Sequence, residues 1–327
     1  MAPRFLVTRD VPGPGIPMLS DVGETTVLDR SPSYEDLRSM CASGDFDVVV
    51  TQLVDRVDSA LIQTARVRGF ANYAVGYDNI DVEAAASRGI TVTNTPGVLT
   101  APTADVAMLL ILATARRCVE ADAFVRSGRF VGWEPELLLG ADVSGRRLGL
   151  IGWGRIARAV AQRALGFDMD VTFATVHDAN RRRRPDELMP GVRQVELTEL
   201  LRNSEFVSLH VPLSETTHHL IDRAALALMR NDAILINTAR GPVVDERALV
   251  DALSNWDIAG AGLDVFEDEP RLTEGLAQLP NTVLLPHLGS ATVRVRHEMS
   301  RLAATNAIAI ASGDSAPHEV QSVSARR

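Results

Sequence analysis

The stretch Leu148–Arg158, LGLIGWGRIAR, limits most strongly the folds that this chain can adopt. Four mostly apolar residues run into Gly152, Trp153 and Gly154, and the small Ala157 follows three positions later. This order predicts a short buried strand, a tight turn and a helix that begins at once. Gly152 permits the turn, Gly154 lets a ligand approach the backbone, and the free N–H groups of the new helix suit a pyrophosphate. Two hypotheses stay open for the loop alone: a dinucleotide site, or a Gly-rich turn that binds nothing.

Short β-rich segments alternate with helical segments on both sides of this stretch. The expected strands are residues 4–8, 25–28, 46–50, two within 66–96, 171–176, 206–213, 233–239, 259–266 and 282–290. The expected helices are residues 101–120, 246–253 and 292–311, and one that begins at Arg223. Such alternation predicts parallel, doubly wound sheets, and 327 residues are enough for two domains. We therefore expect two α/β domains of the Rossmann/flavodoxin-like kind, the second of which carries the glycine loop.

Composition excludes several classes of function. The net charge of −9 and the pI of about 5.3 argue against a nucleic-acid or anionic membrane partner. The longest apolar run, residues 107–113, is too short to span a bilayer, and the start, MAPRFLVTRD, holds no apolar signal segment, so we expect a cytoplasmic enzyme. All 33 basic residues are arginine, which excludes Schiff-base and Walker A lysines. Cys41 and Cys118 form no metal or redox motif, and no metal site is predicted.

Polar side chains follow the expected strands at their carboxyl ends, where parallel α/β sheets bind ligands. Arg240 follows ILINTA, Asp264 and Glu269 follow AGAGL, and His287 follows VLLP. Each alone has an ordinary interpretation as a surface or structural residue. Together they suit the reduction of a 2-oxo acid: a protonated His gives the proton, a carboxylate keeps it protonated, and Arg clamps the substrate's carboxylate. The combination with a dinucleotide loop therefore favours hydride transfer.

These segments and others resemble one family along nearly the whole chain, from about Arg4 to Val320. The matching segments are AVGYDNID (74–81), TAPTADVAMLLILATARR (100–117), LGLIGWGRIARAVAQRALGF (148–167), FVSLHVPLSETTHHLI (206–221), INTARGPVVDERAL (236–249), AGAGLDVFEDEP (259–270) and LLPHLGSAT (284–292). The sequence resembles the D-isomer-specific 2-hydroxyacid dehydrogenases, and within them the glyoxylate/hydroxypyruvate reductases. The resemblance implies an enzyme that moves a hydride from NAD(P)H to a small 2-oxo acid and yields the D-2-hydroxy acid.

The resemblance also implies residue roles. Arg240 would bind substrate, Glu269 would pair with the histidine, and His287 would be the acid/base. The N–H groups of Val75 and Gly76 would bind the substrate carboxylate, with Leu53 lining the site. The residues implied in cofactor binding are Thr103, Gly152, Trp153, Gly154, Arg155, Ile156, Thr175, Arg181, His210, Pro212, Thr217, Thr238, Ala239, Asp264 and Gly289. His218, His219, His297 and His318 match no functional position, and we expect them to be surface residues.

The family's architecture implies two domains, of which the substrate-binding domain is discontinuous. Residues 1–98 and 291–327 would form that domain, with the dinucleotide-binding domain, 99–290, inserted into it. The helices 101–120 and 292–311 would be the hinge for a closure that excludes water. Relatives imply a homodimer through the cofactor domain, with the arm at 127–144 crossing to the partner.

Two departures from the family pattern bear on specificity. Thr175 stands where a carboxylate would hold the ribose 2′-OH of NAD, and Asp178 is a less natural substitute. The run Asn180–Arg184 supplies four arginines that suit a 2′-phosphate, although it can also be a solvated surface cluster. We therefore expect NADP rather than NAD. In the arm, Trp133 is present but Leu137 replaces a second tryptophan of some relatives, which predicts room for larger 2-oxo acids.

Two alternative functions remain open on sequence. Phosphoglycerate-dehydrogenase-like enzymes share the core motifs and reduce or oxidise a different substrate. Corepressor-like dinucleotide-sensing proteins of the same fold can keep Arg240, Glu269 and His287 without being enzymes. The three residues alone therefore do not separate the last alternative from a dehydrogenase.

Overall fold

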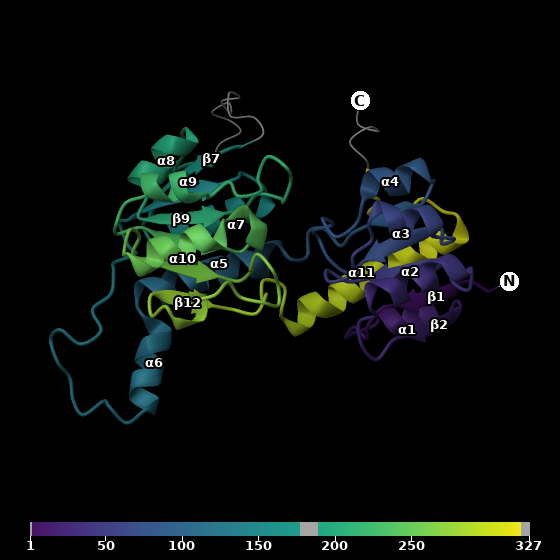
Figure 1. The fold of residues 1–327 in the computed structure, drawn as a ribbon, viewed down its shortest axis with the longest axis horizontal. Helices are drawn as coiled ribbons and strands as arrows, with labels where there is room; N and C mark the ends of the chain where they lie inside the picture. Colours follow the sequence, from purple (N-terminus) through teal and green to yellow (C-terminus); the bar gives the residue numbers. More distant parts are fainter. Residues whose placement is uncertain (1, 177–188, 322–327) are drawn as a thin grey trace. The chain divides into compact units, whose positions relative to one another are not determined.

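The computed structural model describes residues 2–176 and 189–321. The chain forms two compact units, residues 1–99 with 290–327 and residues 100–289, and each contains its own parallel sheet (Figure 1). The predicted fold class, two doubly wound parallel α/β domains, is confirmed. The assignment of substrate binding to one unit and dinucleotide binding to the other stays a prediction.

The first unit is built on a five-stranded parallel sheet in the order β2-β1-β3-β4-β5. Its strands are β1 (Arg4–Val7), β2 (Glu24–Val27), β3 (Val48–Thr51), β4 (Gly69–Asn72) and β5 (Thr91–Thr93). Its helices are α1 (Gly15–Ser20), α2 (Tyr34–Ser43), α3 (Ser59–Thr64), α4 (Val82–Ser87) and α11 (Val293–Ser312). Side chains of β1 alternate between two cores: Phe5 and Val7 pack with α11, whereas Leu6 packs with Leu37 and Leu61 of α2 and α3. Burial on both faces explains the continuous apolar run of the central strand β3.

The second unit is built on a seven-stranded parallel sheet in the order β12-β11-β10-β9-β6-β7-β8. Its strands are β6 (Arg147–Ile151), β7 (Asp170–Ala174), β8 (Val192–Gln194), β9 (Phe206–Leu209), β10 (Ile234–Asn237), β11 (Gly260–Leu263) and β12 (Thr282–Leu284). Its α-helices are α5 (Thr100–Ala115), α6 (Cys118–Arg126), α7 (Arg155–Leu165), α8 (Leu197–Asn203), α9 (Arg223–Leu228) and α10 (Glu246–Ser254), and its 3-10 helices are η2 (Gly241–Val243) and η3 (Leu276–Gln278). The strand order reverses between β6 and β9, which is where such sheets form a ligand crevice.

The predicted elements exist, but several were too long. The helix expected at 101–120 ends at Ala115, where Arg117 adopts the left-handed conformation and a new helix begins. The carbonyl of Ala115 instead accepts a hydrogen bond from the Ala141 N–H at 2.8 Å. The strands expected at 206–213, 259–266 and 282–290 end at Leu209, Leu263 and Leu284. The residues beyond them form the loops of the carboxyl edge. Within the described part of the chain, no helix is long and apolar enough to cross a membrane.

Candidate functional site

The predicted catalytic residues follow three neighbouring strands and lie at one edge of the second unit's sheet. β10, β11 and β12 are parallel and adjacent, so their carboxyl ends meet at the same edge. Arg240 comes three residues after β10, Asp264 directly after β11, and His287 three residues after β12. Glu269 lies in the loop that follows Asp264. All four therefore belong to residues 100–289 and surround one end of the sheet.

Glu269 and His287 form a hydrogen-bonded pair. The His287 Nδ1 lies 3.0 Å from Glu269 Oε2, and Glu269 Oε1 accepts a hydrogen bond from the Phe266 N–H at 3.0 Å. The two side chains remain 30% and 37% exposed, so the pair faces solvent. Desolvation alone would raise the pKa of Glu269, but the hydrogen bond and charge of His287, the Phe266 N–H and the charge of Arg240 outweigh it and hold that pKa below its usual value. Glu269 is therefore ionised at neutral pH and orients the imidazole.

Asp264 ties together the backbone around His287. Its two carboxylate oxygens accept hydrogen bonds from the N–H groups of Leu288 at 2.6 Å and Gly289 at 2.8 Å, and its carbonyl accepts one from the His287 N–H at 2.9 Å. The hydroxyl of Thr103 donates to the Gly289 carbonyl at 3.1 Å. Burial raises the pKa of Asp264, although its two N–H partners act in the opposite direction. These contacts bring together three residues that the sequence assigned to the cofactor, Thr103, Asp264 and Gly289, and the predicted acid/base His287.

The glycine loop lies where the strand order reverses, between the ends of β6 and β9. Gly152 has a φ of 102°, and a Cβ there would lie 2.4 Å from the His210 carbonyl oxygen. The Gly152 N–H donates to the Ala174 carbonyl, and the His210 N–H donates to the Ile151 carbonyl, both at 2.8 Å. Only glycine therefore fits at this position without a shift of the backbone, and the loop is fixed to both neighbouring strands.

Helix α7 begins directly after this loop, with Gly154 as its N-cap. No side chain of the described residues caps the helix, and its first turn holds no acidic residue, so the first N–H groups, those of Arg155 and Ile156, lie at the positive end of the helix dipole. Gly154 is exposed, and a Cβ there would meet no atom of the described chain within 4 Å. An open backbone site of this kind fits the pyrophosphate of a dinucleotide.

Two buried polar atoms of predicted cofactor residues, Trp153 Nε1 and Thr238 Oγ1, have no hydrogen-bond partner among the described residues. The Trp153 indole stacks on Phe173, with ring centroids 4.1 Å apart, so its side chain belongs to the core and only its backbone can face a ligand. The Thr238 hydroxyl follows β10 directly, and Ala239, whose N–H is bonded to the Asn237 side chain at 3.0 Å, comes next. An orphaned hydroxyl at the carboxyl edge fits a polar ligand there.

Other predicted cofactor residues bond mainly to the protein itself. Burial lowers the pKa of His210 to about 3, and its Nε2 lies 3.0 Å from the Ser208 hydroxyl oxygen, so this imidazole is neutral. The Thr217 hydroxyl donates to the carbonyl of the exposed Pro212 at 2.6 Å and accepts from the Ser214 N–H at 2.8 Å. These side chains shape the loop after β9.

The region that the sequence predicts to select the coenzyme is described only in part. Thr175 is half-buried and comes directly after β7, beside the glycine loop. Arg181, and with it Asp178 and the arginine run to Arg184, lies outside the described residues.

The predicted substrate-binding residues of the first unit lie in two neighbouring loops. Leu53 follows β3, and Val75 and Gly76 follow β4. The side-chain amide of Asn72 donates to the Gly76 carbonyl and that of Asn94 to the Val75 carbonyl, both at 2.8 Å. In the described part of the chain, the N–H groups of Val75 and Gly76 donate no hydrogen bond. Two adjacent free N–H groups of this kind suit a carboxylate.

Of the four histidines expected at the surface, two are exposed and two are half-buried with a side-chain partner. His218 and His297 are exposed, but His219 is half-buried with its Nε2 2.6 Å from Glu267 Oε1, and His318 is half-buried with its Nδ1 3.2 Å from the Asn306 side-chain oxygen. Glu267 could not be predicted as the partner of His219, because 48 residues separate the two in the sequence.

Comparison with known proteins identifies the class. Residues 108–289 match the family described as D-isomer specific 2-hydroxyacid dehydrogenase, NAD binding domain. The chain is 47% identical to a glyoxylate reductase of Thermococcus litoralis, over 98% of this chain and 97% of that protein. It is also 47% identical to a glyoxylate reductase of Pyrococcus horikoshii, over 97% and 95%.

Solved structures agree with this class. A glyoxylate reductase from Paecilomyes thermophila is 33% identical, covers 98% of both chains and superposes with a TM-score of 0.86. An NADPH-dependent glyoxylate/hydroxypyruvate reductase from Sinorhizobium meliloti, solved with NADP and malonate, is 35% identical, covers 98% of this chain and 97% of that one, and gives a TM-score of 0.84.

The chain belongs to the D-isomer-specific 2-hydroxyacid dehydrogenase family, and the resemblance drawn from its sequence motifs is confirmed. It is an oxidoreductase that uses a nicotinamide dinucleotide.

Proposed function

We propose that this protein reduces glyoxylate or a similarly small 2-oxo acid, such as hydroxypyruvate, to the D-2-hydroxy acid with NAD(P)H. The observation that carries this proposal is the Glu269–His287 pair, at the same sheet edge as Arg240 and in the same unit as an open backbone anion site. Full-length relatives named glyoxylate reductases support the choice of substrate.

The dinucleotide is held by the second unit in this proposal. The N–H groups of Arg155 and Ile156 bind its pyrophosphate, with Gly152, Trp153 and Gly154 giving the backbone room to approach. The residues that follow the other strands border the rest of the cofactor; these are Thr103, Thr175, His210, Pro212, Thr217, Thr238, Ala239, Asp264 and Gly289. When bound, the nicotinamide supplies the hydride.

The chain's own residues handle the proton and the substrate's charge. His287 gives a proton from Nε2 to the substrate's carbonyl oxygen, while Glu269 fixes the ring through Nδ1. Arg240 clamps the substrate's carboxylate and polarises its carbonyl. The free N–H groups of Val75 and Gly76 also bind the substrate's carboxylate, and Leu53 lines its surroundings.

NADPH is the proposed coenzyme. Thr175 offers no carboxylate after β7 to hold a ribose 2′-OH or to repel a 2′-phosphate, and the following arginines, Arg181 among them, suit that phosphate. The relative from Sinorhizobium meliloti is NADPH-dependent. A panel of 2-oxo acids against NADH and NADPH tests the choice; equal or better kcat/KM with NADH would contradict it. Activity confined to glyoxylate and hydroxypyruvate would contradict the prediction that Leu137 leaves space for larger 2-oxo acids.

A homodimer through the second unit is also proposed. α6 and the segment after it extend away from the rest of this unit (Figure 1), and this arm exposes the large apolar side chains of Val131, Trp133 and Leu139. Exposed apolar groups gathered on one segment are typical of an interface. Sedimentation analysis of the full chain tests it, since a monomer at micromolar concentration would contradict the proposal.

Replacement of the acid/base tests the reaction itself. His287→Ala should lower kcat by about 10²–10⁴-fold, because the proton donor is lost. Its NADPH affinity should stay near that of the wild type, which separates a chemical defect from a folding or binding defect. Near-normal turnover in the variant would remove His287 from this role. If the wild type oxidises neither coenzyme with any 2-oxo acid, a dinucleotide-binding protein without enzymatic activity becomes the better interpretation.

A further inference from the structure

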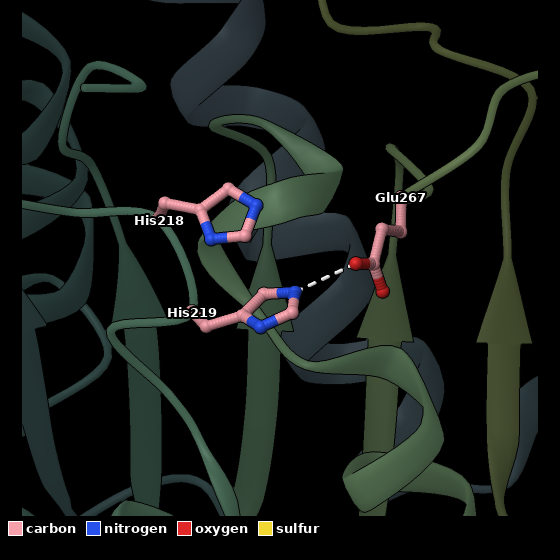
Figure 2. A group of neighbouring side chains, drawn as sticks. All are labelled: His218, His219 and Glu267. Carbon is pink, nitrogen blue, oxygen red and sulfur yellow. Dashed lines mark hydrogen bonds and ion pairs between the residues drawn. The ribbon is translucent and has the colours of Figure 1, made fainter. Parts of the chain in front are cut away.

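A second cluster of histidine and carboxylate lies beside the Glu269–His287 pair but uses different residues. His218 and His219 come from the loop between β9 and α9, and Glu267 comes from the loop after β11 (Figure 2). One ligand atom from each residue lies within 4.8 Å of the other two, and the two imidazole rings stack with centroids 4.1 Å apart. His218 is exposed, whereas His219 and Glu267 keep 34% and 29% of their side-chain surface. The three donors therefore share a corner that is open to solvent.

The backbone on both sides of this cluster is anchored. The His219 N–H donates to the Pro242 carbonyl at 2.8 Å. Glu267 and the buried Glu246 bond reciprocally: the Glu246 N–H donates to Glu267 Oε2 at 3.1 Å, and the Glu267 N–H donates to Glu246 Oε1 at 2.7 Å. Glu267 Oε2 is thus fixed by the Glu246 N–H, and Glu267 Oε1 points toward His219. Ligating carboxylates in metal sites are supported by such hydrogen bonds.

The charge and donor types of the corner favour a cation. Glu246 has its second oxygen bonded to the Thr273 N–H at 3.3 Å, so its charge is met by backbone dipoles. Glu267 is therefore the carboxylate that this cluster offers to a cation. Two imidazoles and one carboxylate form a donor set that proteins use for Zn²⁺, with a fourth position left for water. Mg²⁺ and Ca²⁺ prefer oxygen ligands and do not suit two histidines.

The distances require only side-chain adjustment. Ligands about 2.1 Å from a tetrahedral metal lie about 3.4 Å from one another. The His219–Glu267 separation of 2.6 Å would have to widen by less than an ångström. The exposed His218 would turn its ring toward them. Neither movement needs a change in the anchored backbone.

We propose that His218, His219 and Glu267 bind one divalent transition metal ion of the Zn²⁺ type. This site is separate from the proposed catalytic pair, because Glu269 is engaged by His287 and Phe266 while Glu267 is engaged by His219 and Glu246. Both pairs nevertheless depend on the one loop after β11.

Metal binding to the untagged full-length protein tests the proposal. The probes are Zn²⁺ in equilibrium dialysis and Co²⁺ in visible absorption, whose d–d bands report the ligand geometry. His218→Gln is the sharpest variant, because the side chain is exposed and its described contact is the stacking on His219. Glu267→Gln removes the anionic ligand at constant size. His297→Gln, at another exposed histidine, is the matched control, and Cys118→Ser removes the exposed thiol as a competing ligand.

The expected result is one Zn²⁺ per chain, with Co²⁺ bands that Zn²⁺ displaces and excess Mg²⁺ does not. His218→Gln and Glu267→Gln should each weaken Zn²⁺ binding by more than about tenfold, the lower end of losses seen when only supporting residues are changed. His297→Gln and Cys118→Ser should bind as the wild type does. Unchanged Zn²⁺ affinity in His218→Gln, with its thermal unfolding also unchanged, would overturn the proposal, as would binding that Cys118→Ser abolishes.

Discussion

Gly152 and Gly154 lie two residues apart in the glycine loop, yet the structure predicts a loss of stability when the first is replaced by alanine and a loss of coenzyme affinity when the second is. A Cβ at Gly152 would lie 2.4 Å from the His210 carbonyl oxygen and 2.8 Å from its carbonyl carbon, in a residue whose φ is 102°. The backbone conformation costs an L-residue about 1–3 kcal/mol, and relief of the overpacked contact costs about 1–3 kcal/mol more. Gly152→Ala should therefore lower the free energy of unfolding by about 2–6 kcal/mol, a large part of a typical total of about 5–15 kcal/mol.

At Gly154 the added methyl group meets no described atom within 4 Å, and its φ is −81°. Because alanine is less favourable than glycine at an N-cap, Gly154→Ala should lower the free energy of unfolding by no more than about 1 kcal/mol. The methyl group would instead occupy space that the proposed pyrophosphate needs, so NADPH affinity should fall by at least about tenfold, or about 1.4 kcal/mol.

Urea and thermal unfolding without coenzyme measure the first effect, and NADPH fluorescence titration measures the second. The Tm of Gly152→Ala should fall by roughly 4–24 °C, at about 2–4 °C per kcal/mol for a unit of this size. A Tm within a degree of the wild type would refute the steric argument at Gly152. Normal NADPH affinity in Gly154→Ala would refute the proposed pyrophosphate site.

Three further predictions concern groups around the same edge. Although desolvation raises the pKa of Glu269, its His287 partner holds the net value below that of the unfolded chain, about 4.3. The stability that Glu269 adds is therefore present above that pH and lost as the pH falls through the lower pKa of the folded state. In urea unfolding, the difference in free energy of unfolding between the wild type and Glu269→Gln should therefore shrink between about pH 5 and pH 3. A difference that grows in acid would contradict the pairing. Asp264→Asn should lower the free energy of unfolding, measured in urea, by about 1–3 kcal/mol, because the Asp264 carboxylate oxygens accept hydrogen bonds from two backbone N–H groups, one of them from Gly289. Unchanged stability would contradict this anchoring role. Burial lowers the pKa of His210 to about 3 from an unfolded value of about 6.5, so the free energy of unfolding should fall as the pH drops through this range, by about 2 kcal/mol at pH 5. His210→Gln should lack this loss. Parallel curves of stability against pH for the two proteins would contradict the lowered pKa of His210.

The fold was predictable because alternation of strand and helix signals depends on local sequence. The ends of the strands were not. FVSLHVPL is mostly apolar and β-rich, yet β9 stops at Leu209, before His210 and Pro212. In the loop beyond it, the Thr217 hydroxyl bonds to the Pro212 carbonyl, a contact that strand propensity does not register. The predicted strands therefore extended into the loops that carry the proposed site residues.

The site was predictable only where residues follow strands. The carboxyl ends of parallel neighbours meet, so Glu269 and His287 could be expected together. His219 and Glu267 also lie beyond strand ends, but each sits in a loop whose path depends on tertiary contacts such as the bond from His219 to Pro242. Nothing in either loop's sequence indicates that the two would meet, and His219 was therefore expected to be a surface residue.

Asp264 explains why the acid/base geometry depends so little on the rest of the chain. It begins the loop that carries Glu269, and its carboxylate holds the Leu288 and Gly289 N–H groups directly after His287. One residue thus fixes both loops from which the pair approaches. Because all of these residues lie in 100–289, the distance between Glu269 and His287 is set within a single unit. Residues of this unit alone therefore hold the proposed proton donor in position.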